Sequence, residues 1–80
     1  SRMTNKELQT KLKSVGIRIT YISKGRRYYL SRKELERKAN MFKRLQIKAK
    51  KLGIRLMYKY RGVYKYKSYE TLYNQISKKI

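Results

Sequence analysis

The sequence is an internal duplication with a period of 37 residues. Shifted by that distance, residues 6–43 align with residues 43–80 without a gap. The identical pairs include Leu8/Leu45, Gln9/Gln46, Lys11/Lys48, Lys13/Lys50, Gly16/Gly53, Ile17/Ile54, Arg18/Arg55, Tyr21/Tyr58, Gly25/Gly62, Tyr29/Tyr66, Ser31/Ser68 and Leu35/Leu72. Because glycines, serines and apolar residues stay in step, a chance match of two Lys-rich segments does not explain the alignment. A repeat of this size buries its apolar face by stacking on its neighbour.

We therefore predict one domain over residues 3–80, made of two repeats at about 6–42 and 43–80. Ser1 and Arg2 precede the first methionine, and we expect them to be left over from expression rather than part of the fold. Each repeat is expected to form a helix, a hairpin and a second helix. The fold class is α+β, a tandem duplication in the order α-ββ-α-ββ-α, with two β-hairpins sharing a long central helix.

Helix boundaries are marked by capping residues. Thr4 with Glu7, and Ser31 with Glu34, have the spacing of a capping box. Gly16 is expected to end the first helix, and Gly53 to end a central helix that starts at Ser31 and runs to about Leu52. The apolar faces are Leu8, Leu12 and Val15 on the first helix, and Leu35, Ala39, Phe42, Leu45, Ala49 and Leu52 on the central one. A last helix is expected to begin at Ser68 and to bury Leu72, Ile76 and Ile80.

The predicted hairpins lie between the helices. Strands are expected at 17–22 and 26–30 around a three-residue loop ending at Gly25, and at 54–59 and 63–67 around a loop ending at Gly62. All four glycines are expected to have positive φ. With these loops Tyr21 lies opposite Arg27. One face, predicted to pack on the helices, carries Ile17, Ile19, Tyr21 and Tyr29, and in the second copy Ile54, Leu56, Tyr58, Tyr64 and Tyr66. The outer face of the second copy, expected to be mainly basic, carries Arg55, Met57, Lys59, Val63, Lys65 and Lys67.

Composition limits the class of function. Lys and Arg number 24 against four acidic residues, which gives a formal net charge of +20. The sequence has no Cys, His or Asp, so neither a zinc site nor ordinary acid–base catalysis is expected. No segment predicts a membrane span or a secretion signal. We expect a binding module, not an enzyme, with no cofactor or metal and with a polyanion as its partner.

Double-stranded DNA is the favoured partner, because neutralising its phosphates releases counterions and a two-stranded ribbon fits the major groove. The predicted DNA-binding residues are Arg18, Lys24, Arg26 and Arg27 in the first hairpin region and Arg55, Lys59, Arg61, Lys65 and Lys67 in the second. The basic helix faces, with Lys43, Arg44, Lys48 and Lys51, are the next candidates. Three tyrosines are expected to be exposed, namely Tyr28, Tyr60 and Tyr69. RNA, or an acidic capsid or core protein, stays open as an alternative partner.

The run Gly16-Ile17-Arg18-Ile19-Thr20, followed by Gly25-Arg26-Arg27-Tyr28-Tyr29-Leu30-Ser31 and Leu35, resembles a basic repeat segment in proteins of nucleocytoplasmic large DNA viruses. The second copy is similar, so the likeness covers almost the whole chain. It departs from the pattern at Met57 and Val63, where Thr and a basic residue are expected. The resemblance implies a viral protein packaged with the genome or acting on it, in the virion or in the host nucleus or viral factory. It does not imply equal contributions from the two hairpins.

Overall fold

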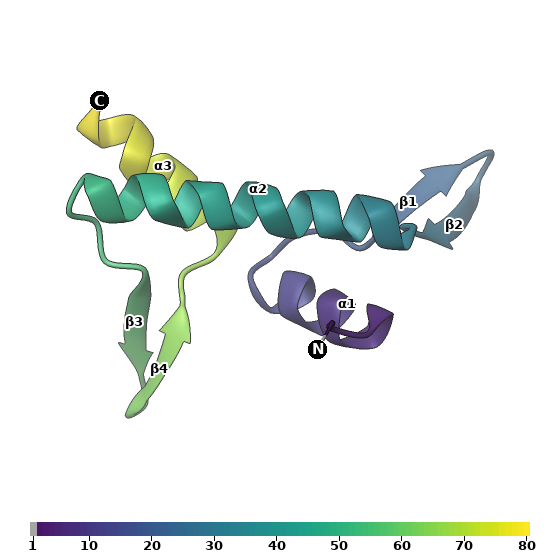
Figure 1. Ribbon diagram of the computed structural model, residues 1–80, viewed down its shortest axis with the longest axis horizontal. Helices are drawn as coiled ribbons and strands as arrows, with labels where there is room; N and C mark the ends of the chain where they lie inside the picture. The colour runs from purple at the N-terminus through teal and green to yellow at the C-terminus, as the bar shows by residue number, and fades with distance from the viewer. Residues whose placement is uncertain (1) are drawn as a thin grey trace.

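The computed structural model describes residues 2–80 and confirms the predicted order of elements. The helices are α1 (Asn5–Ser14), α2 (Arg32–Lys51) and α3 (Tyr69–Lys79). The strands are β1 (Thr20–Ser23), β2 (Arg26–Tyr29), β3 (Met57–Tyr60) and β4 (Val63–Tyr66). Two antiparallel hairpins, β1–β2 and β3–β4, therefore alternate with three helices in an α+β fold (Figure 1).

The predicted caps begin all three helices. The Thr4 hydroxyl accepts a hydrogen bond from the Glu7 N–H at 3.1 Å, and the Glu7 carboxylate accepts one from the Thr4 N–H at 2.8 Å, which completes the capping box. Ser31 caps α2 by accepting from the Glu34 N–H, but its own hydroxyl donates to the Glu34 carboxylate, so the reciprocal backbone bond of a full box is not formed there. Ser68 caps α3 by accepting from the Thr71 N–H at 3.1 Å.

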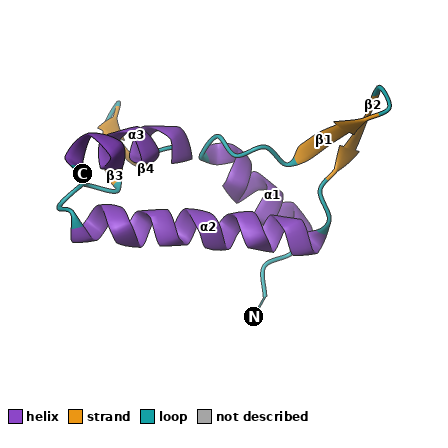
Figure 2. Ribbon diagram, turned by 90° about the horizontal axis from the view of Figure 1, so that it is seen from above, coloured by secondary structure: helices purple, strands orange, loops and turns teal. Residues whose placement is uncertain are grey.

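Helix α2 is the centre of the molecule, and α1 and α3 pack along one side of it, each against a different half (Figure 2). Ile17 contacts both of the resulting apolar clusters, and the Tyr69 N–H donates to the Val15 carbonyl at 3.0 Å, which joins the two repeats. The first cluster consists of Leu8, Leu12, Leu30 and Leu35, and the second of Val15, Phe42, Ala49, Leu72 and Ile76. Ile80 was expected to extend the α3 stripe, but it is exposed at the end of the described chain.

The strands are shorter than predicted and stand apart from the helices. Residues 17–19 and 54–56 form links without strand pairing, whose apolar side chains pack into the core. Within residues 2–80 each strand contacts only its hairpin partner, and Figure 1 shows both hairpins projecting from the helices. The prediction that one sheet face packs against the helices is therefore wrong. The links supply the core contacts that the strands were expected to make.

The hairpin loops contain two residues rather than three. Ser23 pairs with Arg26 around Lys24-Gly25, and Tyr60 pairs with Val63 around Arg61-Gly62. Both residues of each loop have positive φ, 51° and 77° in the first and 50° and 80° in the second, as a type I′ turn requires. This turn matches the right-handed twist of the strands, so Lys24 and Arg61 adopt a conformation that non-glycine residues usually avoid. Positive φ is confirmed at all four glycines.

The shorter loop changes which residues share a face. Tyr21 lies opposite Tyr28, not Arg27, and Tyr29 lies opposite Thr20 on the other face. In the second hairpin, Tyr58 pairs with Lys65 and Tyr60 with Val63, whereas the opposite face pairs Met57 with Tyr66 and Lys59 with Tyr64. Directly opposed residues point to the same side of a sheet. Each face of the second hairpin therefore mixes tyrosines with lysines, and the predicted basic outer face is wrong.

Candidate nucleic-acid interface

Almost all of the positive charge is free of carboxylate partners. Among residues 2–80 the ion pairs are Arg2–Glu36 at 3.2 Å and Arg32–Glu36 at 3.6 Å, both to the same glutamate. Arg2 lies outside the predicted domain and makes an exposed contact, which contributes at most about 1 kcal/mol. The remaining lysines and arginines of residues 2–80 have no carboxylate partner.

The first arm, residues Thr20–Tyr29, carries its cations close to its turn. Lys24 occupies the turn, and Arg26 and Arg27 begin β2; all three are exposed. Their backbone positions are set by the Lys24-Gly25 turn. Tyr21 and Tyr28 stack across the two strands with ring centroids 5.5 Å apart. The arm thus presents three cations within four residues beside a stacked aromatic pair.

Arg18 lies in the link before the first arm and is also exposed. It lines a shallow depression at the base of the arm together with Lys13, Arg27 and Tyr29. The fold thereby brings Arg18 and Arg27 to one concave surface, although they are nine positions apart in the sequence. Lys24 and Arg26 do not line this depression.

The second arm, residues Met57–Tyr66, places cations beside aromatic rings. Lys59 Nζ lies 5.7 Å from the centroid of Tyr64, and Lys65 Nζ lies 5.3 Å from that of Tyr60. The Arg61 guanidinium lies 5.2 Å from the centroid of Tyr60. Cation–π contacts at exposed sites contribute about 0.5–1 kcal/mol, enough to bias these side chains toward the rings without removing their charge.

Lys67 and Arg55 lie at the base of the second arm. The Lys67 ammonium is half-buried and donates to the Gln75 side-chain oxygen at 3.0 Å. The equivalent residue of the first repeat is Leu30, which is buried. Lys67 therefore does not lie on an outward face of the hairpin as predicted, but with Arg55 lines a shallow depression beside Lys78 and Lys79 of α3.

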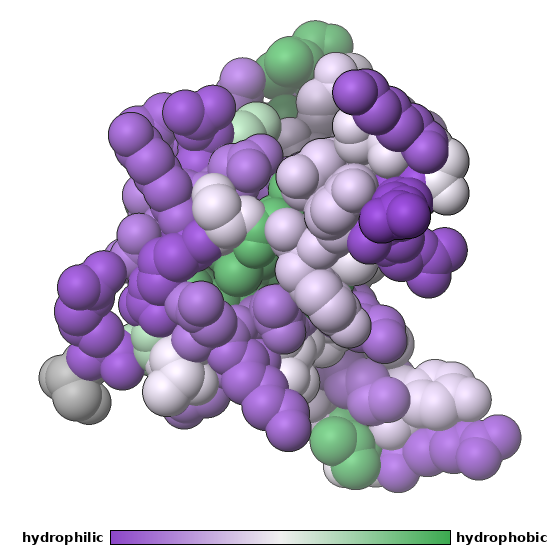
Figure 3. All heavy atoms as spheres, turned by 90° about the vertical axis from the view of Figure 1, so that its right-hand side faces the viewer, coloured by the Kyte–Doolittle hydropathy of each residue, from purple (hydrophilic) through white to green (hydrophobic). Residues whose placement is uncertain are grey.

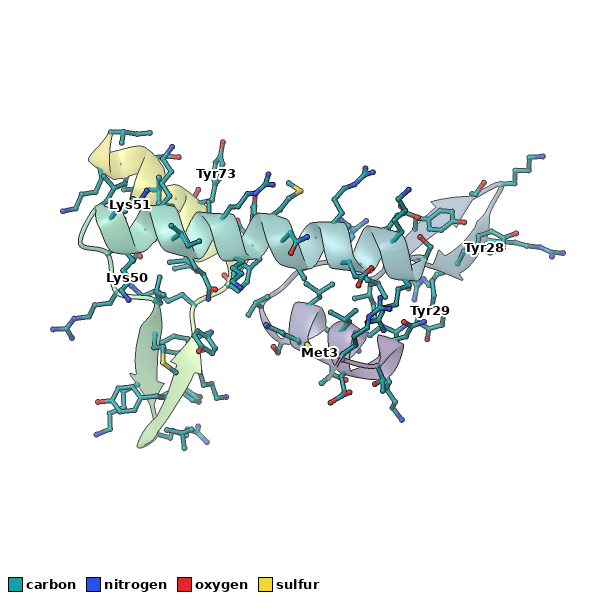
Figure 4. All side chains as sticks on the ribbon, viewed as in Figure 1. Met3, Tyr28, Tyr29, Lys50, Lys51 and Tyr73 are labelled. Atoms are coloured by element: carbon teal, nitrogen blue, oxygen red, sulfur yellow. The ribbon has the colours of Figure 1, made fainter. Side chains whose placement is uncertain are left out.

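The tyrosines are distributed differently from the prediction. Tyr21, Tyr29, Tyr58, Tyr64 and Tyr66 were placed in the core, but all five are exposed. Tyr28 and Tyr60 are exposed as predicted. Tyr69 is half-buried instead, with its ring centroid 6.4 Å from that of Phe42. Figure 4 shows Tyr28 and Tyr29 projecting from the first arm.

A row of cations along α2 is a further basic surface, which we call the α2 ridge. Its residues are Lys33, Arg37, Arg44 and Lys51, all exposed. Arg37, Arg44 and Lys51 recur every seven residues, which keeps them on one side of a helix, opposite the buried Leu35, Phe42 and Ala49. Sequence reasoning named Arg44 and Lys51 as secondary candidates but missed Lys33 and Arg37. The seven-residue spacing was the signal that could have found Arg37, and the four-residue step from Arg37 to Lys33 the signal for Lys33.

Hydrophilic side chains cover most of the molecular face drawn in Figure 3, with small apolar areas between them. No group of three or more metal-ligating side chains occurs among the described residues. No helix within residues 2–80 is long and apolar enough to cross a membrane. The pKa of Glu7 is lowered by its hydrogen bond from the Thr4 backbone and by the Thr4 hydroxyl, a capping effect remote from both arms.

Comparison with known proteins found no matching family model, no similar curated protein and no similar solved structure.

Proposed function

We propose that this protein binds double-stranded DNA with little sequence preference, chiefly through phosphate contacts. The observation that carries the proposal is the large number of exposed cations without carboxylate partners on both arms and on the α2 ridge. Each cation that neutralises a phosphate releases condensed counterions, and this gain does not depend on the base sequence. Contacts to phosphates orient a protein on DNA but carry no sequence information directly.

The shape of the arms supports a duplex as the partner. Each arm is a lone two-stranded ribbon, an element that fits the major groove. Lys24 and Arg61 lie at the two turns, at the ends of the ribbons, where their charged side chains can extend to phosphates at the edge of the groove. Arg26, Arg27, Lys59 and Lys65 continue the positive charge along the strands.

Two arms on one chain also support a role in condensing DNA. The arms leave α2 from opposite ends, and Figure 1 shows them projecting in different directions. The 20-residue α2 is about 30 Å long, so the arms can hold two separate DNA segments. Together with the resemblance to basic repeats of large DNA viruses, this arrangement leads us to propose packaging, condensation or DNA targeting in the virion or the host nucleus or viral factory.

A salt titration of duplex binding tests the proposal. Fluorescence anisotropy should show affinity falling with log salt at a slope equivalent to roughly 5–8 phosphate contacts, and random competitor DNA should displace a labelled duplex almost as well as unlabelled copies of it. A slope near zero, or a preference of about a hundredfold for one sequence, would contradict it. Tighter binding to duplex RNA or to an acidic protein in parallel titrations would favour the corresponding alternative partner.

A further inference from the structure

The chain separates its aromatic residues by location. Its one phenylalanine, Phe42, is buried in the core. Seven of its nine tyrosines lie on the two arms, and all seven are exposed. These arm tyrosines are Tyr21, Tyr28 and Tyr29 on the first arm and Tyr58, Tyr60, Tyr64 and Tyr66 on the second.

Stabilisation of the hairpins explains only some of these rings. Tyr21 and Tyr28 stack on each other across the strands, a pairing that stabilises a hairpin by less than about 1 kcal/mol. Tyr29, Tyr64 and Tyr66 have 69%, 65% and 54% of their surface exposed, and among the described residues no second ring stacks on them. Because the arms contact no helix within residues 2–80, packing against the core does not account for them either.

The second arm arranges its rings and charges as a stacking platform would require. Tyr64 and Tyr66 are two positions apart on β4, so their side chains point to the same face, about 7 Å apart along the strand. Lys59 lies on the same face opposite Tyr64, with its ammonium 5.7 Å from that ring. A base resting on Tyr64 would therefore have a cation close enough to meet its phosphate. Aromatic side chains beside a positively charged surface are the common device for holding single strands.

We propose that the arm tyrosines, Tyr64 and Tyr66 above all, stack on unpaired nucleobases, so that this protein holds single-stranded segments by base contacts in addition to phosphate contacts. The inference rests on the proposed nucleic-acid binding and extends it. In a duplex the faces of the bases are covered by their neighbours, whereas a single strand offers them to a ring. Unpaired bases of DNA and of RNA share this chemistry.

The test compares a Tyr64→Val/Tyr66→Val variant with the parent protein. Valine keeps the strand preference but has no aromatic face. Binding is measured to a single-stranded DNA, a single-stranded RNA and a duplex DNA of equal length, at roughly 0.3 M salt, where phosphate contacts are weakened. Stacking contributes about 1–3 kcal/mol per base, so the double variant should lose at least about tenfold in affinity for single strands. Its duplex affinity should change less than about threefold.

Two matched variants control for general effects. Tyr64→Phe/Tyr66→Phe keeps both rings and should bind single strands like the parent. Tyr73 on α3 is as exposed as Tyr66, at 54%, so Tyr73→Leu removes an equally exposed ring away from the arms and should leave binding unchanged. Circular dichroism and a thermal melt check that each variant is folded.

A direct readout on the parent protein keeps the proposal testable even if a variant does not fold. The chain has no tryptophan, so its intrinsic fluorescence comes from tyrosine, and stacked bases should quench it on single strands more than on the duplex. Stacking is supported if the valine variant loses affinity for single-stranded DNA or RNA and if the same nucleic acid quenches the tyrosine fluorescence of the parent. The nucleic acid that gives both effects is the one whose bases stack on the arm tyrosines. Unchanged single-strand affinity in the valine variant, or equal quenching by duplex, overturns it. If the duplex salt slope stays near its expected value in that case, the proposed duplex binding survives; if the parent binds neither form, the proposed function itself fails.

Discussion

The two arms share one backbone design but differ in side-chain chemistry. Both use a two-residue turn of a basic residue and glycine, with nearly the same φ angles. At the equivalent positions, however, the Arg26, Arg27 and Tyr28 of the first arm are replaced by Val63, Tyr64 and Lys65 in the second. The first arm gathers its cations at the turn beside a tyrosine pair, whereas the second intersperses them with rings. The turn fixes the shape of each arm, and the exposed positions are free to carry different contacts.

The difference continues at the base of each arm. The residue that follows the first arm is Leu30, which is buried against Leu8 and Leu35, whereas the residue that follows the second arm is Lys67, which is half-buried and donates a hydrogen bond to Gln75. The first repeat thus closes its arm with an apolar contact and the second with a polar one. The second core cluster includes Phe42 and Val15, which give it apolar contacts that the first cluster lacks. The repeats therefore differ in how they anchor their arms as well as in what the arms present.

The largest expected effect tests whether the repeats are one cooperative unit. Leu35 and Leu72 are equivalent residues, and neither has exposed surface. Leu35→Ala and Leu72→Ala should each lower the free energy of unfolding by about 2–5 kcal/mol, because each leaves a cavity. Since α2 and Ile17 belong to both clusters, chemical denaturation followed by circular dichroism should show a single transition in each variant. Two separate transitions in either variant would mean that the repeats unfold independently.

The next comparison sets the arms against each other and against α2. Three triple variants each remove three charges: Lys24, Arg26 and Arg27 to Gln on the first arm; Lys59, Arg61 and Lys65 to Gln on the second; and Arg37, Arg44 and Lys51 to Gln on the α2 ridge. Each lost phosphate contact should reduce the salt slope of duplex binding by about one, so each triple variant whose residues all touch phosphate should lose about three. We expect this from both arms, measured by anisotropy over a range of salt concentrations.

The same variants should stay folded, and their melting temperatures should equal or exceed that of the parent because self-repulsion falls. If the variant of one arm keeps the full salt slope of duplex binding, that arm does not contact DNA. The prediction that both arms contribute would then be wrong. If both arm variants keep the full salt slope and the ridge variant does not, the α2 ridge is the surface that contacts DNA. Lys67 is left out of the second-arm set because its bond to Gln75 gives it a structural role.

The sequence predicted the features that depend on a few local residues. Caps at Thr4, Ser31 and Ser68 and stops at Gly16 and Gly53 have specific chemistry, so the helices and their order followed from the sequence. The hairpin register did not, because the same residues allow loops of two or three residues. In the two-residue loop Lys24 and Arg61 must adopt positive φ, whereas in the three-residue loop they need not. Positive φ costs each residue about 1–2 kcal/mol, and the match between this turn and the twist of the strands offsets that cost.

The candidate site was predicted in part for the same reason. Lys24, Arg26 and Arg61 are exposed under either register, so these cations could be placed from the sequence, whereas the three-residue loop put Arg27 on the face expected to pack on the helices. Most of the arm tyrosines could not be placed, since a high content of aromatic residues indicates a strand but does not show whether that strand is packed or free in solvent. Only the structure shows that the arms stand apart from the helices and that their tyrosine rings are therefore exposed.

An exchange of residues at the base of the arms has a smaller expected effect. Leu30→Lys places an ammonium in a position that is 8% exposed, and the cost of desolvation should lower the free energy of unfolding by about 2 kcal/mol or more. Lys67→Leu introduces the residue of the first repeat into the half-buried equivalent position, and should change stability by less than about 1 kcal/mol, toward higher stability. Thermal and chemical denaturation measure both. Equal destabilisation by the two substitutions would show that the Lys67–Gln75 contact anchors the second arm as strongly as Leu30 anchors the first.

The smallest effect distinguishes the caps of α1 and α3. Both caps accept a backbone N–H, but α1 adds the Glu7 carboxylate, whereas α3 has the uncharged Thr71 at the corresponding place. The Thr4 backbone and hydroxyl lower the pKa of Glu7 in the folded protein. A carboxyl whose pKa is lowered by folding contributes stability above its unfolded pKa and loses that contribution as the pH falls through its folded pKa.

Glu7→Gln should therefore melt slightly below the parent at neutral pH, and the gap should close on acidification from about pH 6 to about pH 3, the range in which a glutamate titrates. Parent and variant are identical at every other position, so the difference between their melting temperatures isolates Glu7. Ser68→Ala is the control, because it removes a cap that contains no carboxylate. The difference in melting temperature between this variant and the parent should not change over the same pH range. A gap between parent and Glu7→Gln that stays constant with pH would show that the Glu7 carboxylate does not stabilise α1 through its charge.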